Sequence, residues 1–325
     1  LTTDDHKPLI NKVITGEYPP GSTFKPVIAT ACMDNGLADL QVNCTGSMTL
    51  GNNVFHCWSW KKGGHGHVDL KRGIAVSCDI FFYEAAKRLG IDKIHDTAIA
   101  MGLGEKTGIE LPGERPGLIP SREWKLHRFG VPWQQGETLN TGIGQGYVTA
   151  TPIQLATLAA RIASGNAVSP RITRYVGHNA QPRLQLNRLP FTDAALAAVQ
   201  EGMNMVANVP GGTAYAWRIT QPGFEMAGKT GTAQVRRITR EDRATGRVGN
   251  ANQPWKLREH ALFIGYAPVQ LPRYALGIIQ EHGATPDHPH VQMARDILLF
   301  AQQRDPVKLP NAYPVNAASL LGVRG

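Results

Sequence analysis

Apolar runs bounded by glycine, proline and capping residues divide the chain into a helical first part and a β-rich last third. The runs of helical length lie at residues 26–40, 77–89, 91–101, 151–162, 192–206 and 293–304. Gly36 and Gly90 end two of them, as helix C-termini commonly require. Thr151 and Pro152 open another as cap and first-turn residue. We therefore predict helices over these segments.

Three shorter runs near the end of the chain have a strand pattern. They are rich in β-type residues, are bounded by glycine or proline, and lie at residues 230–238, 260–266 and 274–280. Helices followed by neighbouring strands, without βαβ alternation, predict an α+β domain with an antiparallel sheet and a helical lobe. Residues 43–68 predict an irregular loop or short hairpin, and the proline-containing residues 112–132 predict extended surface chain.

Composition narrows the classes of function. The chain has 325 residues, 42% of them hydrophobic, which is enough for a full core. Lys and Arg outnumber Asp and Glu by 34 to 25. The one basic cluster, Arg236 to Arg247, contains Glu241 and Asp242 and no interleaved aromatics, so it predicts a solvated loop and no nucleic-acid partner. No run approaches the roughly 18 apolar residues of a membrane span, and the start at Leu1 suggests a fragment whose anchor lies upstream.

The first of three chemical motifs is Ser22-Thr23-Phe24-Lys25, which follows a Pro-Pro-Gly turn. A serine and a lysine three residues apart share one helical face, so the amine can reach the hydroxyl. A lysine accepts the serine proton only when it is neutral, and burial or a nearby cation lowers a lysine pKa. Lys229 is the expected cation. By itself the motif also fits an ordinary helix start with a surface lysine.

The second motif, Ser77-Cys78-Asp79, is expected to open the helix over residues 77–89. Ser77 then either caps that helix or relays a proton between the lysines and a leaving amine. Asp79 carries a carboxylate that is expected to pair with Lys25 or Lys229.

The third motif, Lys229-Thr230-Gly231-Thr232, begins a β-rich run. On an edge strand, the Thr232 N–H and the Ser22 N–H could form an oxyanion hole. Gly231 leaves room for a substrate against the strand. Lys229 and the threonine hydroxyls would hold a substrate carboxylate. The alternative is a charged edge strand that blocks aggregation.

Residues 223–230 also match G-x-x-x-x-G-K-T, the phosphate-binding loop of nucleotide hydrolases. That loop must open a helix whose N–H groups receive the phosphates. Here a β-type run follows Thr230, and Glu225 would repel a phosphate. The nucleotide-binding interpretation is therefore the remote alternative.

The ordered set of motifs resembles the S-x-x-K, S-x-N and K-T-G signature of penicillin-binding proteins and class A β-lactamases. Residues 18–25, 142–146, 149–155 and 227–233 extend the resemblance to the transpeptidase domain of penicillin-binding proteins. The chain has Asp79 where the signature has asparagine, and it contains Gly64-His65-Gly66. In both features it resembles the penicillin-binding protein 2 group of the rod-elongation machinery. The resemblance runs from about Lys12 to the closing helix.

This resemblance implies a penicillin-binding/serine β-lactamase-like transpeptidase fold over residues 1–325, with a membrane anchor and a pedestal domain upstream. It implies a serine D,D-transpeptidase: Ser22 attacks peptidoglycan stem peptides ending in D-Ala-D-Ala and passes the acyl group to a diamino side chain. β-Lactams would acylate the same serine. It also implies a membrane glycan polymerase of the elongation complex as partner, the periplasmic face of the inner membrane as location, and no cofactor for catalysis.

Two other functional classes share part of this chemistry. A class D-like β-lactamase or a β-lactam sensor would use the same serine and lysine. The long central segment and the Gly-Ile-Gly-Gln-Gly stretch at residues 142–146 favour the transpeptidase. A non-enzymatic scaffold is the third possibility.

The chain also contains a set of soft metal ligands, one of which lies inside the second motif. Cys44, Cys57, His65 and Cys78 have the chemistry of a tetrahedral zinc site, although no compact C-x-x-C pair is present. Such a zinc would be structural and would tether the loop at residues 43–68 to the second motif. The alternatives are His56 or His67 as the imidazole ligand, a Cys44–Cys57 disulfide, or buried free thiols. Cys32 is expected in the core.

Overall fold

The computed structural model describes residues 3–4, 6–182, 185–236, 242 and 253–305. Its labelled helices are α1 (Lys12–Thr15), α2 (Lys25–Asp34), α3 (Leu70–Ala75), α4 (Asp79–Leu89), α5 (Ile91–Ala100), α6 (Arg122–Phe129), α7 (Gln135–Gly142), α8 (Pro152–Ser164), α9 (Asp193–Asn208) and α11 (Pro289–Arg304). Its strands are β1 (Val42–Cys44), β2 (Ser47–Leu50), β3 (Asn53–His56), β4 (Gly66–Val68), β5 (Tyr175–Val176), β6 (Asn179–Ala180), β7 (Ala227–Ala233), β8 (His260–Ala267) and β9 (Tyr274–Gln280).

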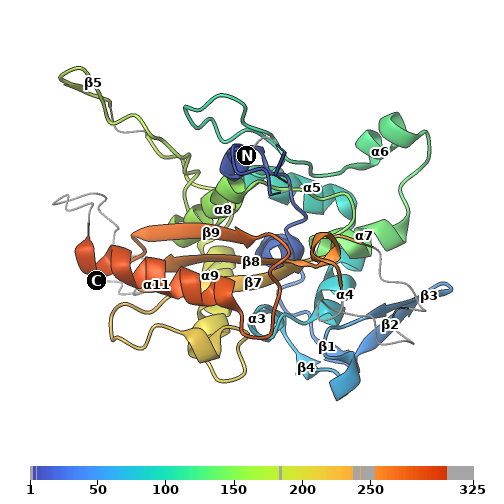
Figure 1. Cartoon of the computed structure of the whole chain (residues 1–325). Coiled ribbons are helices and arrows are strands. Elements are labelled where there is room, and N and C mark those ends of the chain that lie inside the picture. The colour runs from blue at the N-terminus through green and yellow to red at the C-terminus, as the bar shows by residue number, and fades with distance from the viewer. Residues whose placement is uncertain (1–2, 5, 183–184, 237–241, 243–252, 306–325) are drawn as a thin grey trace.

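The central feature is an antiparallel sheet with the order β7-β8-β9. Helices α8 and α9 cover one face of this sheet and α11 crosses the other (Figure 1). The middle strand β8 is buried along its whole length because both of its faces are covered. Strand β7 pairs only with β8 among the described strands, so its second edge is open toward the helical lobe.

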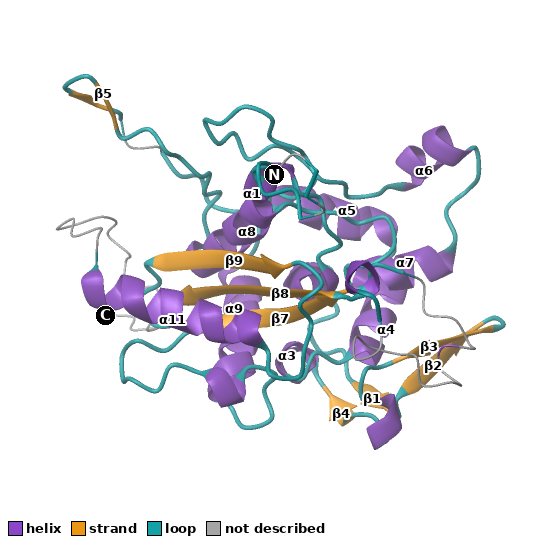
Figure 2. Ribbon diagram, in the orientation of Figure 1, coloured by secondary structure: helices purple, strands orange, loops and turns teal. Residues whose placement is uncertain are grey.

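The helical lobe is built around α2. Every residue of α2 from Lys25 to Cys32 is buried, and the helix packs against α4, α5 and α9. Two antiparallel pairs, β1–β4 and β2–β3, lie beside α4 on the outside of the lobe (Figure 2). The short turn Gly21–Phe24 ahead of α2 contacts β7, and α2 itself contacts α4, so this segment links the sheet to the helix that begins in the second motif.

Helix α8 shows how local sequence signals define an element. The Thr151 side chain accepts from the Gln154 N–H, and the Gln154 side chain accepts from the Thr151 N–H. This capping box satisfies amide groups that a helix start leaves unpaired. Pro152 occupies the first turn, and Gly165 ends the helix in the left-handed conformation.

The α+β prediction is confirmed, and all six predicted helices and all three predicted strands are present; β9 has the predicted ends, and the ends of the others are shifted. The first helix ends at Asp34, and the strand expected at 230–238 is β7, which begins at Ala227 and ends at Ala233. That strand starts early because pairing with β8 stabilises Ala and Gly residues of low strand propensity. The hairpin expectation for residues 43–68 is confirmed by β1 to β4.

The prediction of extended chain over residues 112–132 is wrong for α6. Ser121 accepts a hydrogen bond from the Trp124 N–H, and Gly130 ends the helix in the left-handed conformation. These caps allow a helix between the prolines. Helices α1, α3 and α7 were not predicted. The basic residues at 237, 240, 243 and 247 lie outside the described residues, and no described helix combines the length and apolar character needed to cross a membrane.

Candidate active site

Ser22 lies in a single 3-10 turn, Gly21–Phe24, directly ahead of α2. Gly21 has a φ of +53° and donates its N–H to the Gly144 carbonyl at 2.8 Å. A Cβ at Gly21 would lie 2.3 Å from the carbonyl oxygen of Thr232. The serine turn therefore packs directly against β7, and the third motif approaches the nucleophile through its main chain.

Lys25 begins α2 and is fully buried. Its Nζ donates to Asp79 Oδ1 at 2.7 Å, to the Ser77 carbonyl at 2.9 Å and to Ser77 Oγ at 3.1 Å. An ammonium group has three donors, and the second motif accepts all three. The predicted pairing of Asp79 with Lys25 is confirmed.

Asp79 is the first residue of α4, and burial raises the pKa of its carboxyl group while the charge of Lys25 opposes this rise. The prediction that Ser77 opens or caps this helix is wrong. Ser77 has a φ of +54°, in the left-handed region, and Cys78 is the N-cap residue without a side-chain cap bond. The left-handed turn directs the Ser77 carbonyl and hydroxyl to Lys25.

Trp58 holds the second motif from its other side. Its backbone N–H donates to Asp79 Oδ2 at 2.9 Å, and its indole Nε1 donates to the carbonyls of Val76 and Ser77 at 3.1 Å each. Sequence reasoning missed these bonds. Only its position next to Cys57 in the suspected metal loop hinted at a role.

Lys229 lies on β7 and is fully buried. Its Nζ donates to the Thr230 carbonyl at 3.0 Å. Burial lowers the pKa of Lys229 well below its ordinary value, the charge of Lys25 lowers it further, and Asp79 opposes both. The two lysines of the first and third motifs thus repel each other within one buried cluster, which agrees with the expectation that they converge.

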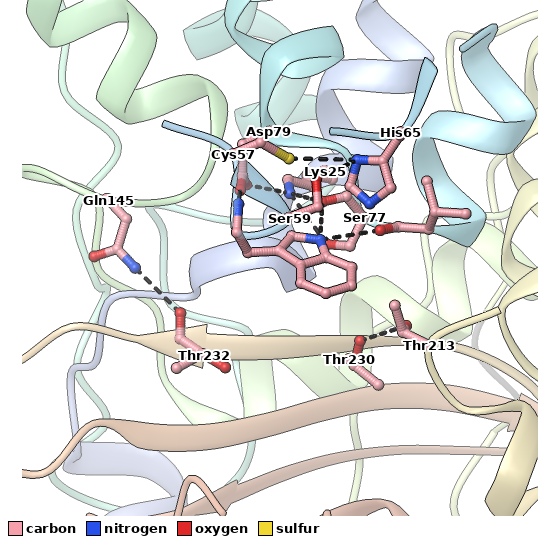
Figure 3. A network of polar contacts seen from close by, with 12 residues as sticks. Lys25, Cys57, Ser59, His65, Ser77, Asp79, Gln145, Thr213, Thr230 and Thr232 are labelled. Carbon is pink, nitrogen blue, oxygen red and sulfur yellow. Dashed lines mark hydrogen bonds and ion pairs between the residues drawn. The ribbon is translucent and has the colours of Figure 1, made fainter. Parts of the chain in front are cut away.

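The rest of the third motif lines the open edge of β7. A Cβ at Gly231 would lie 2.8 Å from the Thr23 methyl group, so this strand position has no room for a side chain. Thr232 is the exposed residue of the strand. Figure 3 shows Thr230 and Thr232 on β7, across from the turn that carries Ser77 and Asp79.

Two further side chains contact the strand and were missed from sequence. Thr213 Oγ1 lies 2.7 Å from Thr230 Oγ1, and Gln145 Nε2 donates to the Thr232 carbonyl at 3.2 Å (Figure 3). Gln145 belongs to the Gly-Ile-Gly-Gln-Gly stretch that was used only as a family marker. These contacts fix the strand from both ends of the motif.

The alternative phosphate-loop interpretation is wrong. Lys229 and Thr230 lie in the interior of β7, paired with Ile264 and Phe263. No helix begins at this position, so the N-terminal N–H groups that would receive phosphates are missing there.

The four suspected metal ligands come together beside the second motif. One donor atom from each of Cys44, Cys57, His65 and Cys78 lies within 4.8 Å of the others. His65 Nδ1 is 3.4 Å from Cys57 Sγ and 3.8 Å from Cys44 Sγ. A tetrahedral zinc ion with usual bond lengths separates such N and S atoms by about 3.6 Å, so the donor set fits zinc.

The remaining sequence alternatives for this cluster are resolved in part. All four cysteines are buried free thiols, so the Cys44–Cys57 disulfide is not formed. His56 and His67 do not belong to the cluster. Cys32 is fully buried in the core, as predicted.

Comparison with known proteins agrees with this geometry. The family model of the penicillin binding protein transpeptidase domain matches residues 2–299. The peptidoglycan D,D-transpeptidase MrdA of Acinetobacter baumannii is 35% identical over 322 residues, which is 95% of this chain and 46% of that protein. MrdA of Escherichia coli K12 is 36% identical over 292 residues, covering 87% of this chain and 45% of that protein.

Solved structures show the same fold. Penicillin-binding protein 2 of Helicobacter pylori, in its complex with MreC, has a TM-score of 0.80 at 31% identity, covering 94% of this chain and 53% of that one. Penicillin-binding protein 2 of Pseudomonas aeruginosa, in complex with WCK 5153, has a TM-score of 0.78 at 32% identity, covering 93% of this chain and 64% of that one. The chain spans about half the length of the MrdA proteins it matches. It belongs to the penicillin-binding protein transpeptidase domain family.

Proposed function

We propose that residues 1–325 form the transpeptidase domain of a serine D,D-transpeptidase that cross-links peptidoglycan stem peptides. The observation that carries this proposal is the buried cluster of Lys25, Ser77, Asp79 and Lys229 beside the turn of Ser22. Acyl transfer needs a nucleophile, groups that move its proton and a cation for the substrate carboxylate. These roles are all filled by residues of the three motifs.

In the acylation step, Ser22 Oγ bonds to the penultimate carbonyl carbon of a peptide ending in D-Ala-D-Ala. The bond from that carbon to the nitrogen of the last D-alanine breaks, and the serine proton passes through Lys25 and Ser77 to the leaving nitrogen. In the second step the amine of a neighbouring diamino side chain attacks the ester carbon. The carbon–Oγ bond breaks, and one amine proton returns to Ser22 Oγ.

The third motif supplies binding and charge stabilisation in this proposal. The backbone N–H groups of Ser22 and Thr232 would hold the oxyanion, because both residues lie where the serine turn meets β7. Lys229 and the Thr230 and Thr232 hydroxyls would hold the terminal carboxylate. All of these steps use the chain's own groups and need no cofactor.

Labelling with a fluorescent penicillin tests the nucleophile. A β-lactam is opened by the same attack, so the parent protein should form a stable fluorescent ester and Ser22→Ala should form none. Ser164→Ala is the matched control, because Ser164 lies on α8 and donates only to its own helix at Ala160. Equal labelling of Ser22→Ala and parent would refute the assignment.

The same assay separates the transpeptidase from the lactamase alternative. A long-lived penicillin ester supports the transpeptidase, whereas rapid release of hydrolysed penicillin would support a class D-like lactamase. The sensor and scaffold alternatives predict no turnover of a peptide thioester with added D-amino acid. The scaffold alternative also predicts that Ser22→Ala rescues cells that lack the parent protein.

We further propose that the chain works at the periplasmic face of the inner membrane with a membrane glycan polymerase. Support comes from its relatives: one similar structure is a complex of penicillin-binding protein 2 with MreC, and another belongs to a study of polymerization and crosslinking by a peptidoglycan synthase complex. Co-purification of the full-length protein with the polymerase from membranes tests this assembly.

We also propose that Cys44, Cys57, His65 and Cys78 hold a structural zinc ion. Support comes from the compact donor set and from its place in the fold: Cys57 precedes Trp58, and Cys78 lies between Ser77 and Asp79. A bound zinc would fix the loop of β1 to β4 against the turn that contacts Lys25.

Elemental analysis of protein purified without chelator tests the zinc site. We expect about one zinc per chain in the parent and in Cys32→Ser, whose thiol is buried outside the cluster. Cys57→Ser should lose the metal and unfold at a lower temperature. The proposal is refuted if the parent protein purified without chelator contains no zinc and has the same melting temperature before and after chelator treatment.

A further inference from the structure

A cavity opens at the end of β7, next to the third motif. Its volume is about 260 Å³, and it includes Thr232 of the third motif. We call it the Thr232 cavity; its other lining residues are Glu259, Ala284, Thr285, Pro286, His288 and His290. Most of these side chains are polar, which is unusual for a gap that packing alone would leave.

His290 is the residue that points to a ligand. It is 3% exposed, and neither of its ring nitrogens has a hydrogen-bond partner among the described residues. The neighbouring His288 also has a buried Nδ1 without a partner there. A buried polar group that lacks a hydrogen bond costs about 1–3 kcal/mol. A ligand group that bonds to these nitrogens would recover that free energy.

The cavity is a continuation of the candidate active site. The Thr232 carbonyl faces the serine turn, since a Cβ at Gly21 would nearly touch it. On a strand, successive side chains point to opposite faces. Position 231 faces Thr23 on the side of α2, so the Thr232 side chain lies on the opposite face, toward the Thr232 cavity. A peptide aligned with this edge would direct a side chain into the cavity.

The lining favours an ammonium group. Burial lowers the pKa of His290 to about 4, so near neutral pH its ring is uncharged and offers an acceptor nitrogen. Burial also lowers the pKa of His288, with Asp287 opposing. Burial raises the pKa of Glu259, and the charge of Arg236 opposes this. A cation near Glu259 would favour its ionised form, and the imidazoles would accept hydrogen bonds from that cation.

We infer that the Thr232 cavity binds the amine-bearing side chain of the donor stem peptide. This inference rests on the proposed function. In a cross-linking reaction every stem peptide can serve as donor or acceptor, so a donor carries the same diamino residue whose amine serves as nucleophile in an acceptor. The cavity would select donors by that amine and align their D-Ala-D-Ala end at Ser22.

Release of D-alanine from two donor peptides tests the inference. Both are Nα-acetyl-Lys-D-Ala-D-Ala, one with a free side-chain amine and one with that amine acetylated. For the parent protein we expect kcat/KM to be about tenfold higher for the free amine, as a desolvated charge-assisted contact provides. Glu259→Gln and Thr285→Lys should reduce this ratio toward one.

The variants are chosen to separate recognition from folding. Thr285 is exposed at the cavity, so a lysine there adds a repelling charge without disturbing the core. Val54→Lys adds the same charge on the exposed β3 strand and should keep the parent ratio. Benzylpenicillin, which has no amine, should label all of these proteins at equal rates.

The outcomes distinguish the two proposals. A parent protein that benzylpenicillin does not label would overturn the proposed function itself. A labelled parent with equal kcat/KM for both peptides would overturn the subsite and leave the transpeptidase intact. A tenfold parent ratio that persists in Thr285→Lys and Glu259→Gln would place amine recognition elsewhere and also overturn the subsite.

Discussion

Replacing Gly21 by alanine tests the close contact between the serine turn and β7. The added Cβ would lie 2.3 Å from the Thr232 carbonyl oxygen, whereas ordinary contacts begin at 3.4 Å. The turn and the strand must therefore separate by about 1.1 Å, the difference between these two distances. A misplacement of about 1 Å at a reacting centre can reduce a rate about a hundredfold. We expect a loss of that size in the acylation rate of Gly21→Ala.

The backbone of Gly21 adds a second, separable cost. Its φ of +53° lies in the left-handed region, which costs an alanine roughly 1–2 kcal/mol. Gly36 provides the control, because its φ is +74° and a Cβ there would have no atom within 4 Å. Gly36→Ala should lower the free energy of unfolding by about 1 kcal/mol and leave acylation unchanged. Gly21→Ala should lose stability and rate together.

Urea unfolding and stopped-flow acylation by a fluorescent penicillin measure the two effects. Comparison of Gly21→Ala with Gly36→Ala cancels the backbone contribution and leaves the contact with Thr232. If the two variants acylate at the same rate, the serine turn does not depend on its distance from β7. The oxyanion hole proposed between Ser22 and Thr232 would then be untenable.

Three further predictions concern the second motif and a buried histidine. Asp79→Asn removes a charge-assisted bond to Lys25 worth about 1.5–3 kcal/mol, so penicillin labelling should slow about tenfold to a hundredfold; parent-like labelling would contradict this. Trp58→Phe removes the indole donor to two backbone carbonyls and should slow penicillin labelling severalfold while the zinc content stays unchanged. Loss of zinc in this variant would instead mean that the substitution had disrupted the fold of the loop at residues 43–68. Burial, with the charge of His282, lowers the pKa of His260 from 6.5 to about 4, so as the pH falls the unfolded chain binds the proton before the folded one. The free energy of unfolding measured in urea should therefore fall by about 3 kcal/mol between pH 6.5 and pH 4. This pH dependence should be smaller in His260→Asn.

Part of the site could be predicted because its chemistry is encoded locally. Ser22 and Lys25 are three residues apart, so any helical start at this position places them on one face. Residues 229–232 combine a glycine and two threonines at the start of a β-type run, which indicated a strand that a substrate can approach. The family motifs then gave the order of these pieces, and the described residues show that they meet.

Other parts depend on contacts between distant segments, which local sequence rules do not report. The bond from Gln145 to Thr232 spans 87 positions of sequence. The contact of Thr213 with Thr230 requires the end of α9 to meet β7. The left-handed Ser77 was taken for a helix start because serine is a common cap. Its conformation becomes understandable only when the bonds from Trp58 and Lys25 are known.

The charges of the site give a physical reason for the proposed binding of a substrate carboxylate at Lys229. Lys25 and Lys229 are both buried, and the carboxylate that opposes both of them is Asp79. Lys25 pairs with Asp79 directly, which leaves Lys229 with a carbonyl oxygen and a lowered pKa. A peptide that brings a terminal carboxylate to Lys229 would supply the missing negative charge and favour its protonated form. The same carboxylate would reduce the repulsion between the two lysines, so donor binding and the charge state needed for proton transfer at Ser22 would be coupled.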